Sequence, residues 1–193
     1  MEAARELRGE WDVVCLKALP GRLGLEAPHF VASCLPQQVK KRPSAVELTA
    51  HPLFWSDDDV AARIKTTYVA LKSNGASDAA LVAALKSVKV DASSLASWRA
   101  RVPPDVLASL NKGIRGAGVY GDGLMELLRF GRNAGEHAHQ SPEAVAWLES
   151  GEKGAAAAAG GLMAGLVAQR LCAELPGLPM ALHAWQALLP KLK

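Results

Sequence analysis

Apolar side chains recur along most of this chain at intervals of three and four residues, which is the spacing of an amphipathic α-helix. The clearest case is residues 124–139, LMELLRFGRNAGEHAH. No long run alternates apolar and polar residues with the period of a β-strand. The sequence therefore predicts an all-α fold of about eight to ten helices. In the segment above, one stripe would contain Leu124, Leu127, Leu128, Gly131 and Ala138.

Start and stop signals divide this pattern into separate helices. Ser44 and Glu47 have the spacing of a capping box, and the three aspartates 57–59 suit the positive end of a helix dipole. Ser77 and Ser141 are placed as caps of two later helices. Helices are thus predicted over residues 2–19, after Ser44, from the aspartates to Asn74, over 79–85, after Pro104, over 124–139, after Pro142, and over 165–175 and 176–189.

Two segments interrupt the helical pattern. Residues 111–123, NKGIRGAGVYGDG, contain five glycines and are predicted to be irregular. Lys112, Arg115 and Tyr120 are the side chains of this loop best suited to RNA, and the Walker pattern of a nucleotide-binding loop is absent. Residues 151–161 are a low-complexity stretch of alanine and glycine.

Composition narrows the classes of protein that fit. The 193 residues carry a formal net charge of +3, which permits an RNA partner without requiring one. No apolar run is long enough to span a bilayer, and the charged N-terminus lacks the core of a signal peptide. We expect a cytoplasmic protein, at the cytosolic face of the endoplasmic reticulum if it belongs to a longer one. Its three scattered cysteines, Cys15, Cys34 and Cys172, are expected to be reduced.

Residues 124–139 also carry the candidate chemistry. Arg129, Asn133 and His137 are four residues apart and would share one face, with Arg132 beside it. A guanidinium, a carboxamide and an imidazole can together hold a phosphodiester and transfer a proton without a metal. Spacing alone leaves open the alternative that these are ordinary solvated side chains of an amphipathic helix.

A longer motif favours a site. The run from Arg132 to His137, RNAGEH, follows a Leu-Leu pair and a tyrosine, Tyr120, twelve residues before the arginine. This arrangement resembles the nuclease centre of the kinase-extension nuclease (KEN) domain, the family of the inositol-requiring sensor of the unfolded protein response and RNase L. The resemblance implies an endoribonuclease that uses the substrate 2′-hydroxyl and leaves a 2′,3′-cyclic phosphate. It implies no metal and no cofactor, an RNA substrate, and a homodimer.

The same resemblance assigns roles to individual residues. It implies that His137 donates a proton to the leaving oxygen, that Tyr120 helps to take the 2′ proton, and that Arg132 and Asn133 hold the phosphate. The site so implied contains Tyr120, Arg132, Asn133 and His137 as catalytic residues and Lys112, Arg115 and Arg129 as RNA-binding residues.

A second motif lies nearer the N-terminus. Arg42-Pro43-Ser44-Ala45, followed by HPLFW at residues 51–55, resembles the last subdomain of a protein kinase C-lobe. Nothing upstream supplies the glycine-rich loop, the strand lysine, the His-Arg-Asp loop or the Asp-Phe-Gly site that phosphoryl transfer needs. We therefore expect residues 1–55 to be a kinase C-lobe remnant without kinase activity, and residues 56–193 to be the KEN ribonuclease domain.

One position departs from the family. Six residues before Arg132 the family usually carries an aspartate, and this chain has Glu126, which is one methylene longer. A displaced hydrogen bond there would lower the rate. The alternative to an active nuclease is a catalytically weak or inactive helical module for dimerisation or docking. Trp98, after Ser97, resembles a tryptophan of the family near the nuclease centre, and a core tryptophan is the other interpretation.

Overall fold

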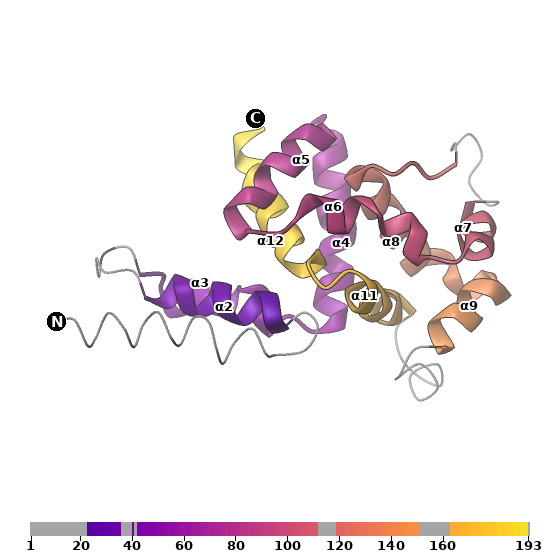
Figure 1. Cartoon of the computed structure of the whole chain (residues 1–193), viewed down its shortest axis with the longest axis horizontal. Helices are drawn as coiled ribbons and strands as arrows, with labels where there is room; N and C mark the ends of the chain where they lie inside the picture. Colours follow the sequence, from indigo (N-terminus) through magenta and orange to yellow (C-terminus); the bar gives the residue numbers. More distant parts are fainter. Residues whose placement is uncertain (1–22, 36–39, 41, 112–118, 151–162, 193) are drawn as a thin grey trace. The chain divides into compact units, whose positions relative to one another are not determined.

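The computed structural model describes residues 23–35, 40, 42–111, 119–150 and 163–192 (Figure 1). Their regular secondary structure is helical, with no β-strand among them, so the predicted all-α class is confirmed. The helix predicted over residues 2–19, the alanine- and glycine-rich stretch 151–161, and the basic residues Lys112 and Arg115 lie outside the described residues.

The chain divides into two compact units, residues 1–55 and residues 56–193. The division falls directly after Trp55, where the sequence predicts a domain boundary. The first unit contains α2 (Leu23–Cys34), α3 (Ala45–Thr49) and the 3-10 turn η2 (Pro52–Phe54).

The capping box predicted at α3 is present. The Glu47 backbone N–H donates to the Ser44 hydroxyl at 3.3 Å, and the Ser44 backbone N–H donates to the Glu47 carboxylate at 2.7 Å. These two bonds satisfy backbone donors that the first turn of a helix leaves without partners. His51 then ends the segment, with its ring Nδ1 accepting a bond of 3.1 Å from the Leu53 backbone.

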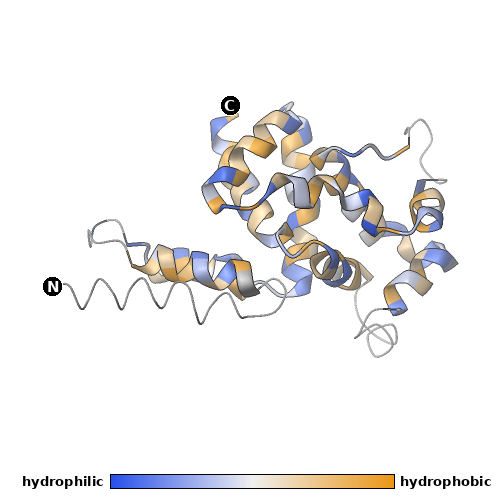
Figure 2. Cartoon of the chain, in the orientation of Figure 1, coloured by the Kyte–Doolittle hydropathy of each residue, from blue (hydrophilic) through white to orange (hydrophobic). Residues whose placement is uncertain are grey.

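The second unit contains most of the described helices. They are α4 (Asp57–Ser73), α5 (Asp78–Leu85), α6 (Ala92–Ala96), α7 (Pro104–Asn111), α8 (Leu124–His137), α9 (Pro142–Glu149), α11 (Met163–Glu174) and α12 (Leu178–Leu188). The 3-10 turns are η3 (Lys86–Val88), η4 (Trp98–Arg101), η5 (Ala138–Gln140) and η6 (Leu189–Lys191). Blue and orange residues alternate along these helices in Figure 2, as expected where one face is buried.

Local signals set the ends of α4. The cap is Ser56, and Asp59 completes a capping box with it, so the aspartates occupy the first turn and do not themselves provide the N-cap. The hydrogen bonds from Ser56 lower the pKa of the Asp59 carboxyl. At the other end, Asn74 is the C-cap, and Gly75 takes a φ of +64° that L residues rarely adopt.

Helices α4, α8 and α11 pack on one another and form the centre of the second unit (Figure 1). Gly131 of α8 lies at this contact. A Cβ at Gly131 would be 3.0 Å from Ile64 Cγ2 on α4 and 3.2 Å from Leu171 Cδ1 on α11. The absence of a side chain there lets α8 approach both neighbours closely, which fixes the helix that carries the candidate chemistry.

A cluster of aromatic rings holds the other side of α8. Phe130 is fully buried, and its ring centroid lies 5.2 Å from that of Trp98 and 5.4 Å from that of Tyr120. Trp98 is also fully buried and meets Tyr120 edge to face at 6.2 Å. Trp98 is thus a core residue that contacts Tyr120, and its role in shaping a nuclease centre stays a prediction.

Candidate active site

The structure brings Tyr120 and Asn133 into direct contact. Tyr120 lies in the segment before α8, and Asn133 lies in the third turn of α8. The Asn133 Nδ2 donates a hydrogen bond of 3.0 Å to the Tyr120 hydroxyl oxygen. Their exposed fractions are only 4% and 2%, so this bond is shielded from water. A carboxamide bonded in this way has a fixed orientation, so it can hold a neighbouring side chain in place.

Arg129 covers the same tyrosine. Its guanidinium carbon lies 4.6 Å from the centroid of the Tyr120 ring, and its Nη2 is 3.0 Å from the Glu126 carboxylate. The other contact of Glu126 is with the Gly121 backbone N–H, which donates to Oε2 at 3.3 Å. Glu126 therefore links the segment next to Tyr120 to α8. Although its side chain is one methylene longer than that of aspartate, its carboxylate has two partners.

Arg129, which is predicted to bind RNA, also has partners within the protein. Its guanidinium contacts a carboxylate and an aromatic ring. Only 18% of its side chain is exposed. In this structure Arg129 holds Tyr120 in position, and a direct RNA contact by Arg129 stays a prediction.

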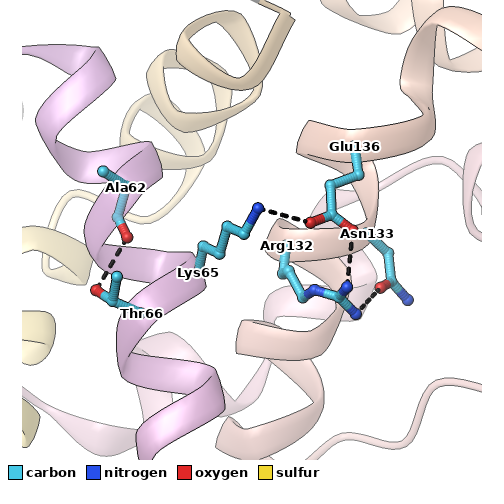
Figure 3. A network of polar contacts seen from close by, with 6 residues as sticks. All are labelled: Ala62, Lys65, Thr66, Arg132, Asn133 and Glu136. Carbon is cyan, nitrogen blue, oxygen red and sulfur yellow. Dashed lines mark hydrogen bonds and ion pairs between the residues drawn. The ribbon is translucent and has the colours of Figure 1, made fainter.

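Arg132 occupies the neighbouring row of α8. Its Nη2 is 2.8 Å from Glu136 Oε2, and its Nη1 donates to Asn133 Oδ1 over a longer distance of 3.4 Å. The other carboxylate oxygen of Glu136 lies 3.1 Å from Lys65 Nζ, which comes from α4 (Figure 3). Tyr120, Asn133 and Arg132 thus form one continuous series of polar contacts.

His137 is the last residue of α8, one turn beyond Asn133, and it is exposed. Within the part of the chain that the structure describes, its imidazole makes no hydrogen bond. The predicted sharing of one helix face by Arg129, Asn133 and His137 is therefore found, with Asn133 buried and His137 open to solvent. An exposed imidazole is accessible to solutes, as a proton donor to a substrate must be.

Burial changes the chemistry expected of Tyr120. Desolvation raises the pKa of the phenol above its ordinary value near 10, and the Asn133 hydrogen bond and the Arg129 charge oppose this only in part. The hydroxyl is therefore protonated at neutral pH. This favours a role in orienting Asn133 over the predicted role of taking the 2′ proton.

Two further residues of the site could not be identified from the motif. Glu136 lies within the RNAGEH motif, but the resemblance assigns it no role. Lys65 lies on α4, about seventy positions earlier in the sequence. The ion pair between them is therefore visible only from the packing of α4 on α8. A hollow of about 410 Å³ adjoins Tyr120, with Arg99, Leu107 and Asn111 among its lining residues.

The described residues hold no group of three or more His, Cys, Asp or Glu side chains placed to bind a metal ion. None of the described helices is long and apolar enough to cross a membrane. Neither Cys34 nor Cys172 forms a disulfide bond within the described residues. Comparison of the chain with protein-family models, with curated proteins and with solved structures gives no match.

Proposed function

We propose that this protein is a metal-independent endoribonuclease of the KEN type. The proposal rests on the resemblance of residues 120–137 to that family and on the contacts that these residues make. The observation that carries it is the series Tyr120–Asn133–Arg132, in which a buried tyrosine fixes an amide beside a guanidinium, with His137 one turn away. We further propose a role in cytoplasmic RNA processing or decay of the unfolded-protein-response type, with the active form a homodimer.

In the proposed reaction the 2′-hydroxyl of one ribose attacks the adjacent phosphorus, and the bond to the 5′ oxygen breaks. Arg132 donates hydrogen bonds to the non-bridging oxygens, where negative charge increases in the transition state. Asn133 is buried, and its Oδ1 accepts from Arg132 and so helps to hold the guanidinium in place. His137 donates a proton to the leaving 5′ oxygen. The proton of the 2′-hydroxyl passes to solvent water, and Tyr120 keeps Asn133 in place.

The products provide the test. Purified protein is incubated with a stem-loop RNA in EDTA, and the new ends are identified. The proposal predicts 2′,3′-cyclic phosphate and 5′-hydroxyl ends, formed at the same rate with and without EDTA. Ends that carry a 5′-phosphate, or cleavage that EDTA abolishes, would refute it.

A second candidate is a helical dimerisation or docking module without nuclease activity. The observation that favours it is the state of Arg132, whose guanidinium is already paired with Glu136. Under this alternative the Glu136 pair is a permanent part of the fold, and no RNA is cleaved at any protein concentration.

A further inference from the structure

The carboxylate of Glu136 lies between two cations that come from different helices. One oxygen is 3.1 Å from Lys65 Nζ on α4, and the other is 2.8 Å from Arg132 Nη2 on α8 (Figure 3). The Lys65 side chain is 61% exposed, so burial does not force it into this position. The two cations therefore converge on one point that an anion occupies.

The Glu136 carboxylate does not engage all the N–H donors of Arg132. The Nε of Arg132 is buried and has no hydrogen-bond partner in the described structure. The Nη1 of Arg132 has only the 3.4 Å contact with Asn133. A guanidinium donates through a fork that matches the oxygens of phosphate as well as those of carboxylate. An anion with more oxygens would satisfy this fork better than Glu136 does.

The space beside the three charged side chains is large enough for such an anion. A hollow of about 210 Å³ is lined by Lys65, Arg132 and Glu136 together with small and apolar residues of α4, α8 and α11. Gly135 of α8 lines it, and a Cβ there would come within 3.3 Å of Ala164 Cβ. A water molecule in the liquid takes about 30 Å³, so the hollow has room for a phosphate group and several waters.

We propose that Lys65 and Arg132 form a phosphate-binding subsite for the RNA backbone, and that the Glu136 carboxylate fills this subsite when RNA is absent. The phosphate that Arg132 holds in the proposed reaction displaces the carboxylate and takes both cations. Lys65 is then a further RNA-binding residue, and Glu136 is an internal competitor that weakens RNA binding. This inference rests on the proposed function, since it requires RNA as the ligand of α8.

The test measures binding separately from cleavage. A labelled stem-loop RNA with 2′-O-methyl groups throughout cannot undergo 2′-hydroxyl attack, so its Kd for the full chain is measured over a range of salt concentrations. Lys65→Met should weaken binding about three- to tenfold and lower the salt dependence by about one counterion. Glu136→Gln should tighten binding by about threefold or more, because it releases two cations to the phosphate. Lys65→Arg, which keeps the charge, should bind nearly as the wild type does.

Matched variants separate a local contact from net charge. Lys72→Met removes an exposed lysine from the same helix, and Glu149→Gln removes an exposed carboxylate at the end of α9. Both should change the Kd much less than the subsite variants do. The subsite is refuted if Lys65→Met equals Lys72→Met and Glu136→Gln equals Glu149→Gln, or if the wild type does not bind the RNA.

Cleavable RNA distinguishes this inference from the proposed function. Cleavage by the wild type with no effect of Lys65→Met on binding would refute the subsite and keep the nuclease. The predicted binding changes without any cleavage would keep the subsite and refute the nuclease. Where both hold, Lys65→Met should lower kcat/KM by at least the factor by which it weakens binding.

Discussion

Tyr120 and Asn133 form a buried polar contact of the candidate site, and their burial determines what each can do. The tyrosine hydroxyl accepts from the asparagine amide at 3.0 Å, and burial raises its pKa, so it is protonated at neutral pH. In the proposed reaction its role is to hold Asn133, since a displacement of ~1 Å in a catalytic group can cost a factor of about 100 in rate.

The change Tyr120→Phe tests this positioning. It keeps the ring that packs on Phe130 and removes the acceptor of Asn133 Nδ2. A buried donor without a partner costs ~1–3 kcal/mol of stability. If the amide turns away to find another partner, the displacement should lower the cleavage rate by a factor of roughly 100. The measurement is single-turnover cleavage of a stem-loop RNA.

A double-mutant cycle provides the control for Tyr120→Phe. If the tyrosine acts only through Asn133, the double variant Tyr120→Phe with Asn133→Ala should cleave no more slowly than Asn133→Ala alone. Losses that simply add would show that Tyr120 acts on the substrate independently of Asn133.

At the scale of elements, α8 is held by its contacts with α4 and α11, and Gly131 is where they are closest. Gly131→Val would place three carbon atoms against Ile64 and Leu171, and overpacking of this kind costs ~1–3 kcal/mol. We expect a loss of that size in the free energy of unfolding, measured by chemical denaturation.

Ala83→Val is the matched variant for Gly131→Val. Ala83 is exposed on α5, so its change to valine reports helix propensity alone, worth at most about 0.7 kcal/mol. Equal losses in the two variants would mean that the α4–α8–α11 contact is looser than described.

Local signals made much of the fold predictable. The capping box at Ser44, the stop at Asn74 and Gly75, and the serine caps at Ser77 and Ser141 act within a few residues of sequence, and all are present. The same holds for the shared face of α8, which follows from helical periodicity.

The arrangement of the site could not be predicted in the same way. The pairing of Glu136 with Lys65 depends on how α4 packs against α8, and no local pattern encodes that contact. The burial of Asn133 and the use of Arg129 to cover Tyr120 depend likewise on the aromatic cluster around Phe130. Spacing therefore predicted which candidate residues share a face of α8 but not which of their side chains are open to solvent.

At the scale of the whole molecule, one copy of the chain offers a single exposed His137 and one partly exposed Arg132. In the family that the motif resembles, nuclease domains act in pairs, and kinase domains joined to them enforce the pairing. We predict a rate per mole of protein that rises with protein concentration. A fused coiled-coil dimeriser should increase it further, since it raises the effective concentration without adding a contact to the site.

Sedimentation under the conditions of the assay is the check on self-association. Full specific activity from protein that sediments as a monomer would exclude a dimeric mechanism. The contrary result, activity that follows the dimer fraction, would agree with a site completed or supported by a second copy.

We propose that His137 donates a proton in metal-free RNA cleavage, and His137→Ala tests this role directly. The side chain is exposed and makes no hydrogen bond in the described structure, so its removal should leave the midpoint of thermal unfolding nearly unchanged. We expect a cleavage rate in EDTA that is lower than that of the wild type by a factor of ~10²–10⁴. A folded His137→Ala variant that cleaves as fast as the wild type would contradict it.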